Sequence, residues 1–347
     1  MATTTLAYHI PIPKDRAGME LDEFLCLQFP LLNKGFLRRQ VRERKVTVDG
    51  NPTVPGHRLA EDEVVIVEFE EDEHLPEAPR DPRIEVPVLF EDEGVLVVDK
   101  PAGLSAEPER WARDAGCLSG ALLGLSLRRS GLELGDGDEV EPVDGLEFRP
   151  RLVHRLDKDT TGCVIVAKTI ESERRLRAAF DQPGSVRKRY LALVEGDWPL
   201  AEGAEEIVDL PIGPDERRSG RMRIDRVDGK ESRTRFSVAE RFDGYTLMQA
   251  EPLTGRTHQI RVHAREVGFP LAVDPVYGRR DHLSLSDFKR DYRKKRGHEE
   301  SSLIDRLTLH AASIEFPGPD GGVVRVEAPL PKDYARVLKQ LRKYRAP

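Results

Sequence analysis

The chain has 347 residues, of which 38% are hydrophobic and 34% are charged, and this composition is typical of a large globular protein. Its formal net charge of −7 argues against a protein that binds nucleic acid over its whole surface. Because the sequence shows no signal peptide, no run of about 18 apolar residues and only three widely spaced cysteines, we expect a cytoplasmic protein with no membrane partner, no disulfide framework and no Cys-x-x-Cys metal site.

The N-terminal residues predict two helices followed by a small sheet. Apolar residues at helical spacing predict a first helix within residues 19–29. Asn33 is the expected N-cap of a second helix, which covers residues 34–44. Residues 45–54 predict two strands joined by an Asp-Gly turn, and residues 63–69 predict a further strand.

The charge of this part is unevenly distributed. Residues 34–45 are strongly basic, whereas residues 61–77 are strongly acidic. Local patches matter more for phosphate binding than the average charge does, because salt screens charges over about 8–10 Å. The second predicted helix therefore forms a candidate RNA-binding surface.

Two helices, a small curled sheet and a basic second helix resemble the S-four-like RNA-binding domain, which is named after a ribosomal protein. The resemblance implies that Arg38, Arg39 and Arg42 bind RNA. Phosphate contacts of this kind depend strongly on salt. The alternative is that the three arginines form only a solvated helix face.

The middle of the chain predicts little regular structure. Residues 73–85 are rich in proline and charge, which predicts a linker. A buried strand is expected over residues 95–100, followed by a Lys-Pro-Ala-Gly turn. Residues 107–150 then predict an irregular insertion, because the stretch 131–145 is acidic and rich in glycine.

The second half alternates strands with few helices. The fold class we expect is therefore α+β, with a mixed, mostly antiparallel sheet, and not a doubly wound parallel sheet. The predicted strands cover residues 162–169, 188–196, 305–316 and 322–330, with a hairpin over 232–253 that turns at Asp243-Gly244, and the predicted helices cover 170–180 and 257–268.

Residues 151–169 form the most unusual stretch of the chain. They place a histidine, an arginine and two aspartates before a tight turn and an apolar strand. Asp157 stands between the basic segment and the turn, directly beyond Arg155 and Leu156. An arginine in this position suits the task of filling the space left by a base that has been extruded from its stack.

Two later segments supply complementary chemistry. Tyr190 lies in a predicted strand, and Arg256 and Arg261 lie where a loop runs into a helix. A carboxylate, an aromatic ring and a guanidinium group together suit a nucleobase: the ring stacks on the base, the carboxylate acts as nucleophile or base, and the arginine keeps it ionised.

The motif HRLDKDTTG (154–162) resembles the signature of the RluA-type pseudouridine synthases. Further landmarks of that family occur in order along roughly residues 86–335, namely VVDKPAG, KRYLALVEG, LTGRTHQIRVH, DPVYG, LHAASIEF and APLP. The resemblance implies a pseudouridine synthase catalytic domain over residues 86–347, with irregular insertions near 107–150 and 279–305. The S-four-like domain would cover residues 1–72, and the linker 73–85.

The resemblance also implies a reaction, the isomerisation of uridine to pseudouridine in RNA with no cofactor and no metal. Asp157 would act at the ribose, either by attack on the anomeric carbon or by removal of the neighbouring sugar proton. Tyr190 would stack on the base, Arg261 would pair with Asp157, and Arg155 would occupy the space of the flipped nucleotide. Arg256 would shape its loop or contact phosphate. We expect a monomer acting on large-subunit ribosomal RNA, with transfer RNA as the alternative substrate.

Two departures from the family pattern are visible. Thr161 stands where the signature has serine, and residues 105–108 read Ser-Ala-Glu-Pro where the family often continues toward Val-His-Pro. The basic run over residues 288–300 predicts either an RNA contact or a solvated insertion. The histidines at positions 154, 258 and 310 are expected to be structural.

Two other functions remain possible at this point. DKDTT (157–161) fits the Asp-x-Asp-x-Thr pattern of haloacid-dehalogenase-like phosphatases, in which Asp157 would be phosphorylated and Asp159 would assist in the presence of magnesium. Alternatively, the chain is a non-catalytic RNA-binding factor of ribosome assembly. Magnesium-dependent phosphatase activity would identify the first, and an inactive site the second.

Overall fold

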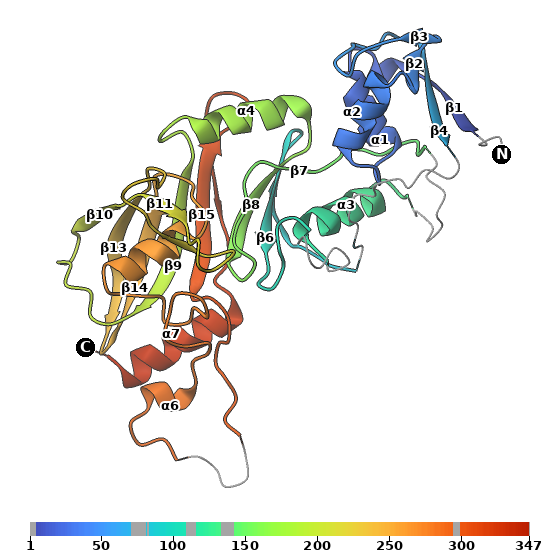
Figure 1. Cartoon of the computed structure of the whole chain (residues 1–347). Helices are drawn as coiled ribbons and strands as arrows, with labels where there is room; N and C mark the ends of the chain where they lie inside the picture. The colour runs from blue at the N-terminus through green and yellow to red at the C-terminus, as the bar shows by residue number, and fades with distance from the viewer. Residues whose placement is uncertain are drawn as a thin grey trace. The chain divides into compact units, whose positions relative to one another are not determined.

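The computed structural model describes residues 5–70, 81, 83–108, 116–132, 142–293 and 299–346 (Figure 1). The chain divides into two compact units. The first unit comprises Met1–Glu85, Glu107–Arg151 and Lys168–Ile170, and the second comprises Val86–Ala106, Leu152–Ala167 and Glu171–Pro347. Within the described ranges, no helix is long and apolar enough to cross a membrane.

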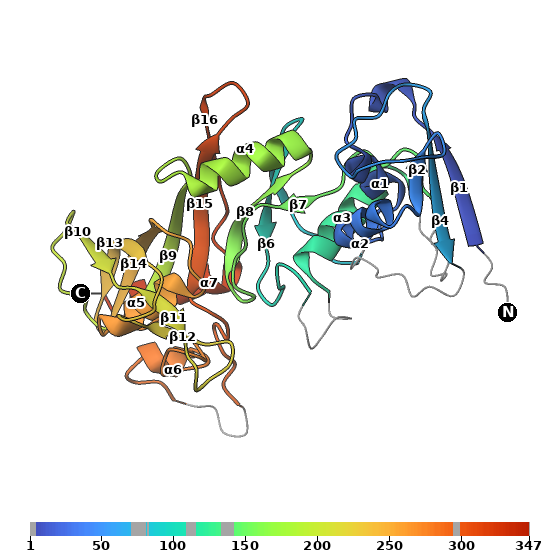
Figure 2. The ribbon, with the colours of Figure 1, turned by 45° about the horizontal axis from the view of Figure 1, so that its top comes forward.

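The first unit packs two short helices against an antiparallel sheet with the strand order β1-β4-β2-β3 (Figure 2). The Asn33 side chain caps α2 by accepting a hydrogen bond from the Gly35 N–H at 2.7 Å, as its sequence position predicts. The elements are β1 (Thr5–Pro11), the 3₁₀ helix η1 (Lys14–Arg16), α1 (Leu21–Gln28), α2 (Lys34–Arg42), β2 (Val46–Val48), β3 (Asn51–Pro52) and β4 (Val64–Glu70).

A third helix belongs to this unit. Residues 107–150 were expected to be irregular, but α3 (Leu118–Arg129) lies within them. Its leucines Leu123 and Leu127 pack with Leu27 of α1 and with Leu146, which gives the helix an apolar partner surface. The acidic, glycine-rich stretch that suggested an insertion falls largely on residues 133–141, outside the described residues, as does most of the predicted linker.

The second unit is built on a sheet of ten strands with the order β10-β13-β14-β9-β15-β8-β6-β5; β16 pairs with β15, and β7 with β8. Neighbours such as β13 and β14 run antiparallel, whereas β15 and β8 run parallel. This confirms an α+β fold with a mixed, mostly antiparallel sheet. The strands are β5 (Val88–Glu91), β6 (Val95–Lys100), β7 (Arg151–Leu152), β8 (Thr161–Ala167), β9 (Arg187–Glu195), β10 (Glu205–Asp209), β13 (Arg233–Phe242), β14 (Tyr245–Pro252), β15 (Leu309–Pro317) and β16 (Val323–Glu327).

Four helices and a small hairpin accompany this sheet. Leu176 of the helix α4 packs with Ile165 and Phe316 in one apolar cluster, and Val337 of α7 packs with Leu193 in another. The sequence analysis did not anticipate α7 or the hairpin β11–β12. The elements are α4 (Ile170–Asp181), β11 (Ile212–Pro214), β12 (Met222–Ile224), α5 (Gln259–Glu266), α6 (Leu285–Phe288) and α7 (Lys332–Tyr344).

Two of these elements bear on the predicted insertion near residues 279–305. The short helix α6 begins with a capping box between Ser284 and Asp287, and Leu283 forms a bridge with Ile304. The insertion therefore has local order on both sides of residues 294–298, which lie outside the described residues. Part of the basic run over 288–300 falls on that gap.

Candidate active site

The loop that carries Asp157 connects β7 to β8 and is fixed by hydrogen bonds to its backbone. The Thr160 N–H donates a hydrogen bond to the Asp157 carbonyl at 3.1 Å, which closes a tight turn. Lys100, fully buried at the end of β6, donates to the Lys158 carbonyl at 2.7 Å and to the Leu104 carbonyl at 2.7 Å. Burial lowers the pKa of Lys100 to about 7. The lysine of the VVDKPAG landmark thus braces the residue next to Asp157.

Strand register brings Tyr190 to the same end of the sheet. Ala311 of β15 pairs with Tyr190 of β9 on one side and with Gly162 of β8 on the other. Gly162 has a φ of +113°, and a Cβ there would lie 2.2 Å from the Ala311 carbonyl oxygen. Only glycine fits this approach. Three neighbouring strands therefore connect Tyr190 to the turn that follows Asp157.

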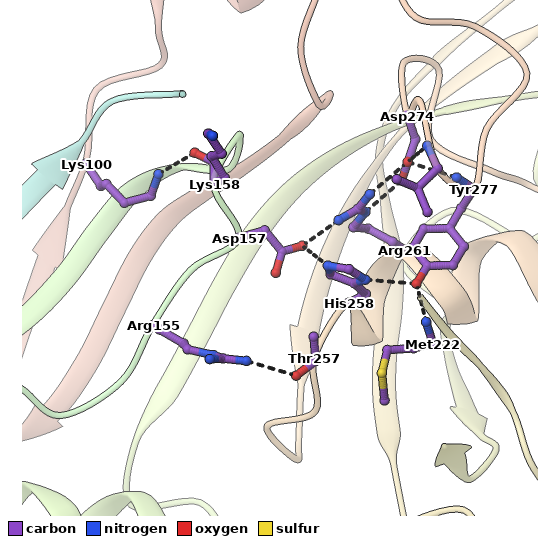
Figure 3. Close-up of polar contacts among 11 residues, drawn as sticks. Lys100, Arg155, Asp157, Lys158, Met222, Thr257, His258, Arg261, Asp274 and Tyr277 are labelled. Atoms are coloured by element: carbon purple, nitrogen blue, oxygen red, sulfur yellow. Dashed lines mark hydrogen bonds and ion pairs between the residues drawn. The ribbon is translucent and has the colours of Figure 1, made fainter. Parts of the chain in front are cut away.

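Arg261 of α5 makes the contact with Asp157 that the resemblance implies (Figure 3). Its Nη1 donates to Asp157 Oδ2 at 3.0 Å, while its Nε and Nη2 donate to the two oxygens of Asp274 at 2.7 and 2.9 Å. Burial alone lowers the pKa of Arg261, but the hydrogen bonds and charges of Asp274 and Asp157 outweigh it, so the pKa is raised. The guanidinium group is therefore a permanent cation with a fixed orientation beside Asp157.

Tyr277 and His258 complete the surroundings of this pair. The Tyr277 ring lies 4.9 Å from the Arg261 guanidinium, and its hydroxyl accepts a hydrogen bond from the Met222 N–H at 2.7 Å. The same hydroxyl lies 2.8 Å from His258 Nδ1, whose Nε2 lies 4.0 Å from Asp157 Oδ2. His258 has a φ of +56°, an uncommon backbone conformation for a residue other than glycine. Burial lowers the pKa of its imidazole, so the neutral ring is favoured.

The sequence analysis did not select Asp274, Tyr277 or His258 for the site. The motif DPVYG, which contains Asp274 and Tyr277, is a landmark of the family. Its sequence does not reveal that Asp274 pairs with Arg261, which lies 13 positions earlier in the chain. His258 was expected to be purely structural, and it stands within the RTHQIR stretch beside the predicted Arg261. The sequence does not show that these residues lie close together in space, and only the structure reveals it.

Asp157, Tyr190 and Arg261 line one cavity of about 530 Å³. This size suits a small-molecule or nucleotide site. Arg155 and Arg256 line it as well: Arg155 Nη2 donates to the Thr257 hydroxyl at 3.2 Å, and Arg256 Nε donates to the Glu231 carbonyl at 3.0 Å. All five residues predicted for this site are thus brought together around one opening.

Tyr190 presents a protonated phenol in this cavity. Only 9% of the residue is exposed. Burial, followed by the negative charge of Asp157, raises the pKa of the Tyr190 hydroxyl well above its usual value. The ring can stack and its O–H can donate a hydrogen bond, whereas a phenolate is strongly disfavoured.

Two further histidines have structural contacts. His154 Nε2 accepts a hydrogen bond from the Ile165 N–H at 2.8 Å, and burial lowers its pKa to about 3. His310 Nδ1 lies 2.9 Å from the hydroxyl of Thr161, the residue that replaces the usual serine. Both contacts fit the expected structural role, although His154 also lines the cavity.

The three arginines predicted to bind RNA belong to α2 of the first unit, whereas the cavity belongs to the second. Arg38 Nε donates to the buried carboxylate of Asp22 at 2.6 Å, and Arg39 lies over the Phe36 ring and 3.9 Å from Glu43. Arg42 is exposed at the end of the helix. The three arginines thus lie on one helix, where Asp22 and Glu43 compensate part of their charge. Among the residues that the structure describes, no group of three or more His, Cys, Asp or Glu side chains is placed to hold a metal ion.

Comparison with known proteins decides the family. A family model described as RNA pseudouridylate synthase matches residues 94–266. The chain is 35% identical to ribosomal large subunit pseudouridine synthase C of Escherichia coli (strain K12), over 97% of each protein. The chain belongs to the RluA-type RNA pseudouridine synthases. This synthase is also 34% identical to ribosomal large subunit pseudouridine synthase D of Nitrosomonas europaea, over 96% of this chain and 87% of the relative.

A solved structure supports the fold. Human RNA pseudouridylate synthase domain containing 1 matches with a TM-score of 0.50 and 23% identity, covering 78% of the synthase and 99% of the human chain. Its family membership, shown by the family model and the 35% identical relative, makes the synthase an isomerase that acts on RNA. The phosphatase interpretation of DKDTT is wrong, because the sheet is mostly antiparallel and 97% of the chain aligns with a pseudouridine synthase. Membership in an enzyme family likewise contradicts the non-catalytic assembly factor.

Proposed function

We propose that this synthase converts specific uridines of large-subunit ribosomal RNA to pseudouridine, with Asp157, Tyr190 and Arg261 as its catalytic residues. The relatives named above are ribosomal large subunit pseudouridine synthases, and the aligned regions cover nearly the whole chain. The observation that carries the site assignment is the Asp157–Arg261 pair at 3.0 Å in the wall of a nucleotide-sized cavity.

In this proposal, Asp157 acts at the ribose of the target uridine. The carboxylate is 23% exposed, so one side faces the cavity while Arg261 orients the other. Tyr190 stacks on the uracil and offers its protonated hydroxyl, and Arg155 fills the space that the flipped nucleotide leaves. Arg256 contacts RNA phosphate from the rim. Each of these groups lines the same cavity, so one bound nucleotide can reach all of them.

We further propose that residues 1–72 form an S-four-like RNA-binding domain, in which Arg38, Arg39 and Arg42 hold the RNA by its phosphates. The order of α1, α2 and a short antiparallel sheet supports this assignment. The basic helix lies on a different compact unit from the cavity, so RNA affinity and chemistry are separable functions. We expect the synthase to act as a monomer, which sedimentation would test.

The test is to map pseudouridines in ribosomal and transfer RNA from cells with and without the synthase. The proposal expects loss of one or a few sites in large-subunit ribosomal RNA, restored by the wild-type protein and not by the Asp157→Asn variant. Sites lost from transfer RNA alone would contradict the ribosomal substrate. Full restoration by Asp157→Asn would contradict the assigned catalytic residue.

A further inference from the structure

Lys188 lies in the proposed active-site cavity, although none of the predicted roles uses it. It precedes Tyr190 by two residues on β9, and side chains two positions apart on a strand point to the same face. Its Nζ would lie 4.0 Å from a Cβ built on Gly255, in the loop before Arg256. Both residues line the cavity. The ammonium group therefore sits between the β9 wall and the loop that leads to Arg261.

An aromatic ring holds this ammonium group in place. Lys188 Nζ lies 5.9 Å from the centroid of the Phe180 ring, a distance at which a cation is attracted to the π face. His154 lies against the same ring, with centroids 4.9 Å apart. His154 is neutral, because its Nε2 accepts the Ile165 N–H. The lysine is thus positioned by contacts that leave its charge uncompensated.

The other cations of the cavity each donate a hydrogen bond to a protein group. Arg261 is paired with two carboxylates, Arg155 donates to a hydroxyl, and Arg256 donates to a carbonyl. The Lys188 ammonium group forms no ion pair and donates no hydrogen bond to any residue within the described ranges. Burial lowers the pKa of its ammonium group. A partly buried cation without a counter-charge is costly unless an anion binds to it.

We propose that Lys188 binds a phosphodiester group that flanks the target uridine, and thereby positions the flipped nucleotide between Tyr190 and Asp157. The phosphodiester is the anionic group of a uridine within RNA, since the oxygens of its base and sugar are neutral acceptors. Lysine binds phosphate as a point charge. This inference rests on the proposed function of the cavity, and it adds a positioning residue to that site.

The first experiment measures RNA affinity and single-turnover rate at several salt concentrations. The substrate is a fragment of the RNA that the pseudouridine mapping identifies. Lys188→Gln should weaken binding by about 10- to 100-fold and reduce the slope of log affinity against log salt by about 0.7, the value for one phosphate contact on a single strand. Lys188→Arg should keep most of the slope.

Matched variants keep this test decisive. Lys339→Gln removes an exposed charge on α7, which does not line the cavity, and should keep the wild-type slope. Lys188→Met is a second neutral variant, whose apolar chain suits the Phe180 contact if glutamine disturbs folding. A wild-type salt slope in the folded neutral variants, Lys188→Gln and Lys188→Met, overturns the proposal, whatever happens to the rate.

The second experiment locates the phosphate. Two substrates each carry one neutral methylphosphonate linkage, on the 5′ or the 3′ side of the target uridine. If Lys188 binds one of these groups, combining that neutral linkage with Lys188→Gln should lower RNA affinity no more than either change does alone. Additive losses at both linkages overturn the proposal.

Asp157→Asn in the same assays separates this inference from the proposed site. An active Asp157→Asn variant would contradict the proposed active site. An inactive Asp157→Asn variant, together with an unchanged salt slope in Lys188→Gln, would contradict only the role assigned to Lys188.

Discussion

Two aspartate–arginine pairs, one in each compact unit, are built in opposite ways. In the first unit, Asp22 is fully buried and its partner Arg38 is 46% exposed. In the second unit, Arg261 is only 5% exposed and its partner Asp157 is 23% exposed. The hydrogen bonds are similar, at 2.6 and 3.0 Å. What differs is which charge faces solvent.

In the proposed function, the more exposed member of each pair is the group that meets RNA. Asp22 would hold Arg38 so that its guanidinium group can bind phosphate, whereas Arg261 would hold Asp157 so that its carboxylate can act on the ribose. Arg261 can do so because Asp274, with no side-chain exposure, holds its other edge. A buried ion pair alone is weak evidence of stabilisation. The direction of exposure is more informative about function than the presence of the pair.

The largest expected effect is at Asp157. Asp157→Asn should lower pseudouridine formation by a factor of about 10³ or more, as when a residue required for the chemistry is removed, while RNA still binds. Asp159→Asn and Asp22→Asn should keep most of the turnover at saturating RNA. Single-turnover assays check all three. Comparable losses at Asp22 and Asp157 would contradict the distinction between the two pairs.

Removing the two arginines should affect stability unequally. Arg261→Ala leaves the buried Asp274 without a counter-charge, and breaking such a pair costs about 3–5 kcal/mol. Arg38→Ala should cost only about 1 kcal/mol, because the arginine is half exposed and Lys34 remains 3.6 Å from Asp22. Urea unfolding gives both values. Equal losses in the free energy of unfolding would mean that the two pairs contribute equally to stability.

Tyr190→Phe tests what the Tyr190 hydroxyl contributes beside the Asp157 carboxylate. The ring still stacks, so RNA affinity should stay constant, while product formation should fall by about 10²-fold if the hydroxyl takes part in proton transfer. Because burial raises the pKa of Tyr190, no activity change due to phenol ionisation is expected between pH 7 and pH 9. A fully active phenylalanine variant would reduce Tyr190 to a stacking surface.

Arg155 and Arg261 should respond differently to RNA structure. Arg155→Ala should lose about tenfold more activity on a structured RNA than on a short single-stranded one, because holding a base out of its stack costs a few kcal/mol. Arg261→Ala should lose similar activity on both substrates, since Arg261 orients Asp157 in every case. If the ratio of activity on structured RNA to activity on single-stranded RNA is the same for both variants, the two arginines do not have these different roles.

The smallest expected effect concerns the basic helix. The Arg39→Gln/Arg42→Gln double variant should reduce the salt slope of RNA binding by about 1.4, with little change in turnover at saturating RNA. Charge neutralisation is preferable to deleting residues 1–72, because Leu27 of α1 packs with Leu123 and Leu127 of α3 and deletion would expose them. An unchanged slope would mean that α2 is only a solvated face.

Local signals in the sequence predicted much of the fold. Asn33 as an N-cap, the Asp243-Gly244 hairpin and the apolar run of β8 all depend on neighbouring residues, and each is present as predicted. The helix α3 was not predicted, because its stability depends on Leu27, about a hundred residues away. Likewise α7 buries Tyr334, whose hydroxyl accepts the Leu193 N–H at 2.8 Å from a distant strand.

By itself, the sequence determined the chemistry available to this synthase. An ordered set of motifs predicted Asp157, Tyr190 and Arg261 as catalytic residues, because residue types and spacing are local properties. Only the tertiary structure decided how that chemistry is supported. Asp274, Tyr277 and Lys188 reach the site through strand register and loop packing, which depend on contacts between residues far apart in the chain. Exposure is also a tertiary property: the Asp157 carboxylate is 23% exposed, whereas that of Asp22 is fully buried.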